Sequence, residues 1–238
     1  MMYKNFICGL LVTLAMGSVA NADLISEFEP NPPGGDPATS TVEWSGVAGA
    51  PFSGFLTFLE TDGTTIGAIN SSDAVSGTFD ASGIAVVSLD FDVENPSYTL
   101  VYSSLAPTAD VDADDDGSLD DTTVFGTVFD AVGIIDAAGD ATNFATELGG
   151  VEFSTPEEFE IAFRDASTGQ FFGFDAATGD VVDTVGTVFT AADFDLDPAL
   201  TTTGSINPTL ITSAAVPEPS STIALALAAG VGLLRRRR

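Results

Sequence analysis

The densest group of side chains that could do chemistry is an acidic run near the middle of the chain. Residues Ala109–Asp121 read ADVDADDDGSLDD, with alternate carboxylates at Asp112, Asp114 and Asp116 followed by Gly117. Alternate carboxylates in a tight loop converge on one hard cation, and Ca²⁺ takes six to eight oxygen ligands. The spacing therefore predicts a calcium site within residues 110–121.

The acidic run departs from an EF-hand at its last position. Reading Asp112 as position 1 of such a loop places Asp120 at position 9 and Thr123 at position 12, where an EF-hand carries a bidentate glutamate. Asp110 and Asp121 are further candidate ligands. We expect an EF-like loop that binds calcium weakly. The alternative is a solvated acidic loop, since runs of like charge are often turns or tails.

The composition excludes most nucleophilic and metal-assisted catalysis. The chain has no histidine, and its lysine and its cysteine, Lys4 and Cys8, both lie near the amino terminus. Nucleophiles activated by histidine, lysine nucleophiles and zinc sites of histidine and cysteine are therefore absent from the rest of the chain. Paired carboxylates that hydrolyse glycosides remain an alternative, although close pairs are a weak signal among 35 acidic residues.

The charge of the chain is strongly one-sided. The formal net charge is −29, and Arg164 is the one basic residue between Asp23 and Glu218. Phosphate binding needs a basic surface, so nucleic acid is excluded as a partner. The charge suits divalent cations, and an acidic surface also keeps an exported protein soluble. We expect Arg164 to pair with Asp165 or a neighbouring acid.

The first 22 residues have the features of a secretory signal peptide. Lys4 gives a positively charged start, an apolar run follows, and Ala20 and Ala22 form an A-x-A cleavage site. We therefore expect residues 1–22 to be removed and the mature chain to begin at Asp23. Cleavage removes Cys8, so disulfide and thiol chemistry are not expected in the mature protein.

The body of the chain has the pattern of short β-strands. Apolar and β-branched runs alternate with turn residues, and Trp44 is expected in the core. Residues from Phe153 to Phe163 alternate as in a half-buried strand. Regular short strands favour an antiparallel β-sandwich or barrel. The clearest predicted strands are Phe52–Glu60, Gly83–Asp90, Tyr98–Ser103, Val124–Phe129 and Phe171–Phe174.

A short internal repeat predicts two successive turns. Asp165–Gly169 reads DASTG and Asp175–Gly179 reads DAATG, with an aromatic run at Phe171–Phe174 between them. Aspartate favours the start of a turn and glycine favours its end. The repeat therefore predicts a strand, turn, strand, turn arrangement.

Several motifs of the body resemble exported lamin-tail-like domains. They are Leu24–Phe28 (LISEF), Asn31–Asp36 (NPPGGD), the acidic loop, Phe129–Gly133 (FDAVG) and the short strand Val42-Glu43-Trp44. The resemblance implies an all-β, immunoglobulin-like antiparallel β-sandwich over residues 23–212. It also implies a role in adhesion or scaffolding on a secreted or surface protein, without catalysis.

The carboxyl terminus has three parts in a fixed order. A Pro-Glu-Pro tripeptide precedes an apolar run, Thr222–Leu234, and the chain ends in a basic cluster. This order resembles the PEP-CTERM sorting signal of exported bacterial proteins, which implies processing by an exosortase near the tripeptide. The sorting residues are Pro217, Glu218 and Pro219, and the basic residues are Arg235, Arg236, Arg237 and Arg238.

The same segment, residues 213–238, has the properties of a weak membrane anchor. Its apolar run of 13 residues spans about 20 Å as a helix, less than the roughly 30 Å hydrocarbon core. Arginines beside it stay on the cytoplasmic side under the positive-inside rule. We expect a short transmembrane or sorting helix that is cleaved, and the alternative is a permanent anchor.

Together these features predict an exported, non-enzymatic β-sandwich protein. We expect transient anchoring in the inner membrane, processing by an exosortase, and a final place on the cell surface or in the extracellular matrix. Calcium is the expected stabilising ion. The alternatives are a carboxylate-dependent hydrolase acting on exopolysaccharide and a carbohydrate-binding adhesion module that holds extracellular polysaccharide.

Overall fold

The structure, a computed structural model, describes residues 23–31, 39–63, 65–90, 97–137, 140 and 144–211. The predicted signal peptide and the predicted sorting segment, including Pro217–Pro219 and Arg235–Arg238, lie outside the described residues. Sequence comparison and experiment therefore test the expectation for the sorting segment, and the signal peptide stays a prediction.

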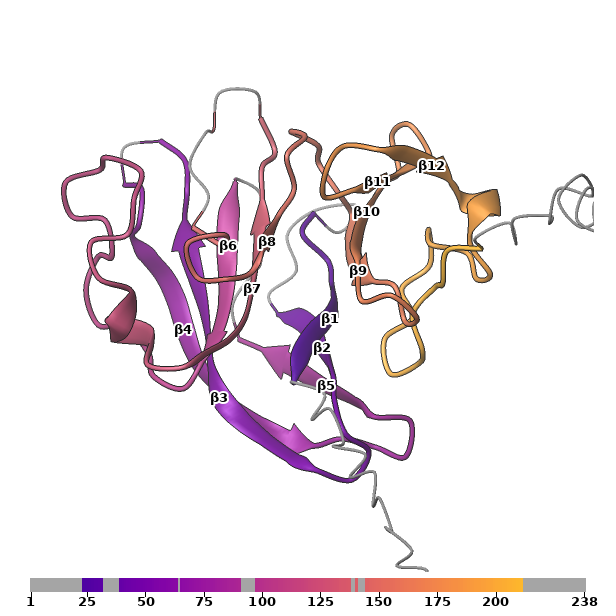
Figure 1. Cartoon of the computed structure of the whole chain (residues 1–238), viewed down its shortest axis with the longest axis horizontal. Coiled ribbons are helices and arrows are strands. Elements are labelled where there is room, and N and C mark those ends of the chain that lie inside the picture. Colours follow the sequence, from indigo (N-terminus) through magenta and orange to yellow (C-terminus); the bar gives the residue numbers. More distant parts are fainter. Residues whose placement is uncertain are drawn as a thin grey trace, which may run out of the picture.

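The described chain folds into two β-sheets (Figure 1). The strands of the first sheet are β1 (Leu24–Phe28), β2 (Ser40–Ser45), β5 (Ile84–Leu89), β9 (Ile161–Arg164), β10 (Phe171–Asp175), β11 (Asp180–Asp183) and β12 (Val188–Thr190). The strands of the second sheet are β3 (Pro51–Glu60), β4 (Ile69–Thr78), β6 (Tyr98–Ser103), β7 (Val128–Ile134) and β8 (Val151–Glu152). The strand orders are β12-β11-β10-β9-β1-β2-β5 and β4-β3-β6-β7-β8, and β7–β8 is the one parallel pair among them.

This architecture confirms the predicted all-β antiparallel sandwich. Most predicted strands are present, but the strand predicted at Val124–Phe129 is wrong in its first half. A 3₁₀-helix, η1, occupies Thr122–Phe125, and β7 begins only at Val128. The Asp121 side chain accepts the Thr123 N–H at the start of this helix, and Asp121 therefore acts as its cap.

Aromatic side chains fill the space between the two sheets. Trp44 of β2 is fully buried, which confirms its predicted place in the core. Its ring lies 5.7 Å from that of Phe52 on β3 and 5.8 Å from that of Tyr102 on β6. Contacts of this kind add to the burial of apolar area, and here they join one sheet to the other.

The outer face of the first sheet is also buried. Ile161 and Phe163 of β9 pack in a second apolar cluster with Phe194, whereas Ala162 belongs to the central core. The prediction of a half-buried strand is therefore wrong, because β9 is covered on both faces. Its outer cover is the carboxyl-terminal segment 191–211, which contains the 3₁₀-helix η2 (Ala191–Asp193).

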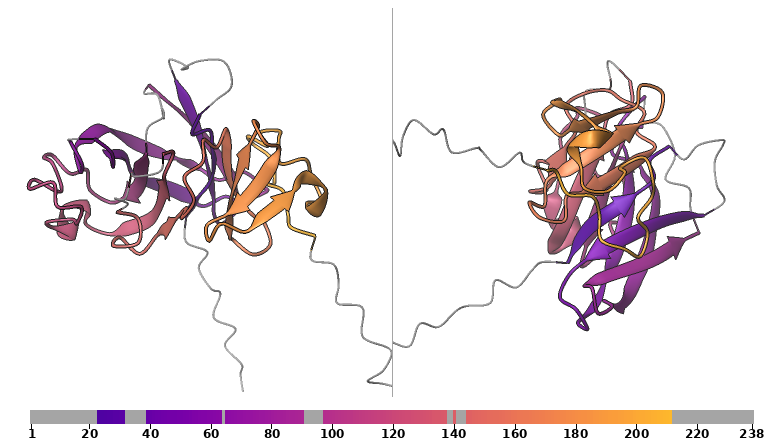
Figure 2. Two further views of the ribbon diagram at one scale, coloured as in Figure 1. Left: turned by 90° about the horizontal axis from the view of Figure 1, so that it is seen from above. Right: turned by 90° about the vertical axis from the view of Figure 1, so that its right-hand side faces the viewer.

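A third apolar cluster covers the outer face of the second sheet. Leu59, Val101 and Ala131 of the sheet pack against Val111 and Phe125 from the connection between β6 and β7. The acidic run belongs to this connection, so the covering segment also carries the predicted calcium loop. The two covering segments lie at opposite ends of the molecule (Figure 2).

The internal repeat forms the two predicted turns of the β9–β10–β11 meander. Asp165 Oδ1 accepts the N–H groups of Ser167 and Thr168, and Asp175 Oδ1 accepts that of Ala177. Gly169 and Gly179 end the turns with φ of 74° and 78°. Glycine adopts this left-handed backbone without steric cost.

Gly173 of β10 provides a test of this packing. A Cβ built on it would lie 2.4 Å from ring atoms of buried Phe159, so Gly173→Val forces core atoms apart. We expect the variant to lose ~1–3 kcal/mol in free energy of unfolding, measured by urea denaturation of the full chain. Ser88→Val, an exposed position on β5, is the control and should stay within about 0.5 kcal/mol of the parent. Equal midpoints for the two variants would contradict the close packing at Gly173.

Candidate functional site

The structure brings together three of the predicted calcium ligands. Carboxylate oxygens of Asp112, Asp114 and Asp116 all lie within 4.8 Å of one another. Asp112 is fully buried, while Asp114 and Asp116 are exposed to solvent. These residues hold positions 1, 3 and 5 of the predicted loop, so one cation can contact all three carboxylates.

Hydrogen bonds fold the loop around the Asp112 side chain. Its Oδ1 accepts the Asp116 N–H at 3.1 Å, and its Oδ2 accepts the Gly117 N–H at 2.8 Å. Asp115 and Gly117 have φ of 53° and 86°, in the left-handed region. Aspartate and glycine tolerate that region better than most residues, which explains their place at the sharpest part of the loop.

The other predicted ligands lie outside the group of three. Asp110 accepts the Asp112 N–H at 3.0 Å, and Asp120 accepts the Ala113 N–H at 2.9 Å. Asp121 accepts the N–H and the hydroxyl of Thr123, 2.8 and 2.6 Å away. These side chains shape the loop or cap the following helix rather than converge on the cluster.

Repulsion among the loop carboxylates affects their ionisation. The nearby charge of Asp116 is the main cause that raises the pKa of Asp114, and desolvation, Asp120 and Asp112 contribute less. Hydrogen bonds from Thr123 instead lower the pKa of Asp121. The negative charge that needs neutralising is therefore concentrated around Asp114.

The loop is closed at its base and is held against the β3–β4 connection. The Val111 N–H donates to the Gly67 carbonyl at 3.1 Å, and the Asp120 N–H donates to the Val111 carbonyl at 2.9 Å. A Cβ on Gly67 would lie 2.6 Å from the Cβ of Asp112. Glycine at this position lets the loop pack directly on the β3–β4 connection, so the cluster stands on a rigid base.

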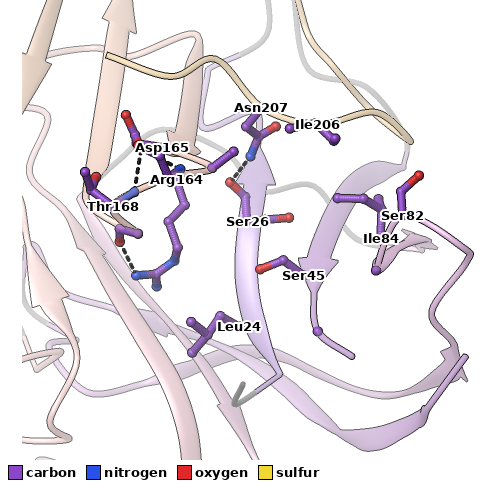
Figure 3. A pocket seen from close by; sticks show the side chains of 15 residues that line it. Leu24, Ser26, Ser45, Ser82, Ile84, Arg164, Asp165, Thr168, Ile206 and Asn207 are labelled. Carbon is purple, nitrogen blue, oxygen red and sulfur yellow. Dashed lines mark hydrogen bonds between the residues drawn. The ribbon is translucent and has the colours of Figure 1, made fainter. Parts of the chain in front are cut away.

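An open groove of about 520 Å³ lies beside Arg164 (Figure 3). Asp165 is its one carboxylate, and no aromatic side chain lines it. Its walls are mainly the small and polar residues of β1, the β2 end, the β9–β10 turn and the segment around Asn207. The pair of acids that a glycoside hydrolase needs is therefore not found in this groove.

Arg164 pairs with Asp130 of β7 rather than with Asp165. The guanidinium Nη2 lies 2.7 Å from Asp130 Oδ2, and both side chains are nearly buried. Its Nε donates to the Ile25 carbonyl at 3.0 Å, and Nη1 donates to that of Gly169 at 2.8 Å. The expected structural ion pair of Arg164 is therefore present, but its partner is Asp130 and not the adjacent Asp165.

A pair of buried glutamates is the feature that sequence reasoning missed. Glu27 of β1 and Glu43 of β2 are direct cross-strand partners, only 3% and 1% exposed. They accept backbone N–H groups of Thr202 and Gly204 from the carboxyl-terminal segment. The available signal was a single glutamate within each of two short strand segments, Leu24–Phe28 and Val42–Trp44.

Comparison with known proteins assigns the carboxyl terminus. The family model of the PEP-CTERM protein-sorting motif matches residues 215–238. The chain carries a PEP-CTERM sorting motif. The motif contains the Pro-Glu-Pro tripeptide, the apolar run and the terminal arginines, and it indicates an exported protein that is targeted by an exosortase.

The PEP-CTERM match does not extend into the sandwich. No lamin-tail or immunoglobulin-like family model matches the body. No curated protein and no solved structure is significantly similar to the chain. In the part of the chain that the structure describes, no helix is long and apolar enough to span a membrane.

Arg164→Met tests the buried ion pair. Removing one partner leaves the Asp130 carboxylate buried without its cation, and we expect a loss of ~3–5 kcal/mol in free energy of unfolding. Adding Asp130→Asn removes that stranded charge. The double variant should therefore be more stable than the sum of the two single losses implies, as measured by chemical denaturation of the full chain. Strictly additive losses would show that the two side chains do not interact.

Proposed function

We propose that the protein is an exported, non-enzymatic β-sandwich of the cell surface or extracellular matrix, whose acidic loop binds calcium. The observation that carries the calcium proposal is the group of Asp112, Asp114 and Asp116, with carboxylate oxygens within 4.8 Å of one another. The PEP-CTERM motif supports export of the protein and its processing by an exosortase.

The donor set of the loop favours calcium over softer metals. All three side chains offer carboxylate oxygens, the ligands of hard cations, and the chain lacks histidine. A bound cation removes the repulsion that raises the pKa of Asp114. Since the position-12 glutamate is replaced by Thr123, we expect a dissociation constant on the order of 10⁻⁴ to 10⁻³ M, as in extracellular modules. The site would then fill after export.

The placement of the acids supports a role without catalysis. The buried cross-strand pair of Glu27 and Glu43 lies beneath residues 202–204, and the two side chains are only 3% and 1% exposed. Among the described residues, Phe129 is the one aromatic side chain that is more than a third exposed. A row of exposed rings for stacking on sugars is not found there, so the structure favours neither alternative that acts on polysaccharide.

Calcium should raise the melting temperature of the full chain. Binding to the folded form stabilises it by mass action, so millimolar calcium should give a higher melting temperature than a chelator does. Asp114→Asn should abolish most of that difference, because it removes a carboxylate from the group of three. Scanning calorimetry in both conditions measures the effect.

Asp115→Asn is the matched control for the calcium experiment. Asp115 is exposed, lies in the same loop and carries the same charge, and asparagine tolerates its φ of 53°. We expect this variant to keep the calcium-dependent shift. Equal melting temperatures of the parent with calcium and with chelator would refute the calcium proposal.

Replacing Pro217–Pro219 with three alanines should block release from the membrane. The tripeptide is the expected recognition element, while the apolar run and the arginines should still hold the chain. Mass spectrometry of cell-surface and membrane fractions, in cells that carry an exosortase, distinguishes processed from intact protein. Alanines at Thr212 and Ser213 are the control and should leave processing unchanged. A mature surface protein that still carries Arg235–Arg238 would show that the segment is a permanent anchor.

A further inference from the structure

The carboxyl-terminal segment is held across β1 and β2 by the two buried glutamates. The Thr202 N–H lies 3.0 and 3.1 Å from the carboxylate oxygens of Glu27, and the Gly204 N–H lies 2.8 Å from Glu43 Oε2. The hydroxyls of Thr202 and Thr203 also donate to Glu27. Asn207 Nδ2 completes the attachment at the Ser26 carbonyl, 2.7 Å away. Residues 201–207 therefore close over the carboxylates.

Within the described residues, no basic side chain neutralises this pair. Glu27 and Glu43 are directly opposite each other on antiparallel strands, where like charges are destabilising. The one basic residue between Asp23 and Glu218 is Arg164, which is engaged by Asp130.

The other charged groups that face the pair are also acidic. Asp80, in the turn before β5, adds repulsion on Glu43, and Glu29 at the end of β1 is repelled by Glu27. Burying two adjacent carboxylates without a counter-ion is costly. A proton is the simplest group that can reduce their charge while the segment stays closed.

We propose that residues 201–207 form a proton-dependent latch, closed while the Glu27–Glu43 pair holds a proton and opened when the pair loses it. Opening exposes both carboxylates to water, where the ionised forms are well solvated. The neighbouring residues 208–211 stay attached, because the Leu210 N–H donates to Asp165 Oδ2 at 2.7 Å and the Ile211 N–H donates to the Asp193 carbonyl at 2.7 Å. The latch does not depend on how the sorting motif is processed.

The ionisation of the pair gives the direction of the effect. Burial raises the pKa of Glu43 from 4.5 to about 7, and hydrogen bonds from Ser26 and Gly204 offset only part of this. Burial also raises the pKa of Glu27. A carboxyl with a raised folded-state pKa favours the closed form below its ordinary pKa. This stabilisation of the closed form is lost as the pH rises from the ordinary pKa towards the raised folded-state pKa. The latch should therefore open progressively between about pH 4.5 and pH 7.

Hydrogen exchange of the full chain in detergent, read at single amides by NMR, tests the latch. After correction for the intrinsic pH dependence, exchange of the Thr202 and Gly204 amides should accelerate by up to about tenfold per pH unit between pH 5 and pH 7. It should level off at higher pH. The Leu210 amide is the internal control and should show no such acceleration, because hydrogen bonds keep the pKa of Asp165 below its usual value despite the opposing effect of burial.

Glu43→Gln identifies the group responsible. Glutamine keeps the size and an acceptor oxygen but cannot ionise, so the pH-dependent acceleration should be reduced to a small fraction. Glu27→Gln should reduce the pH-dependent acceleration in the same way. It replaces Glu43→Gln as the test variant if that variant fails to fold. Glu60→Gln is the matched control, because Glu60 lies on β3 in the other sheet. Burial, with smaller effects of Asp62, raises the pKa of Glu60 to about 7 as well. The proposal is overturned by pH-independent corrected exchange in the parent, by folded glutamine variants that behave as the parent, or by loss of the effect in Glu60→Gln.

Discussion

The sandwich depends on a single cation. Arg164 on β9 of the first sheet binds Asp130 on β7 of the second, and Asp130 Oδ2 also accepts the Ile25 N–H at 2.9 Å. The guanidinium carbon lies 4.2 Å from the centre of the Phe171 ring, which adds a cation–π contact. One ion pair thus ties the two sheets together. Since no other basic residue lies between Asp23 and Glu218, every other acid there must be accommodated in a different way.

The described acids show three ways of meeting that constraint. In the turns, Asp165, Asp175 and Asp183 accept backbone N–H groups, which stabilise a carboxylate without a counter-ion. In the acidic loop, the exposed carboxylates remain in water, where a cation can reach them. In the Glu27–Glu43 pair, the carboxylates are buried and their ionisation is suppressed. The same shortage of basic residues therefore produces rigid turns, a candidate ion site and a titratable latch.

Local patterns in the sequence predicted what depends on local chemistry. Neighbouring residues alone determine the strand alternation and the two DxxTG turns, so both could be predicted. The same is true of the spacing of Asp112, Asp114 and Asp116. An ion pair of Arg164 was predicted, but its partner could not be, because Asp130 lies 34 positions away and on the other sheet. The same holds for the glutamate pair, which is buried only because residues 201–207 return over β1 and β2. The return of segment 191–211 over the outer face of β9 also could not be predicted, and it makes the expected half-buried strand buried on both faces.

The cover of both sheets determines where the molecule can still interact. Segment 191–211 packs on the outer face of the first sheet around β9 and β10, and the connection between β6 and β7 packs on the outer face of the second. The exposed part of the second cover is the acidic loop, and the PEP-CTERM motif follows the first. Of the six basic residues, five lie in the predicted signal peptide and the sorting motif, outside the sandwich. The predicted removal of both segments would leave a body in which Arg164, already bound to Asp130, is the one basic residue. Ions and protons of the surroundings are then the partners that the calcium proposal and the latch proposal assign to its charge.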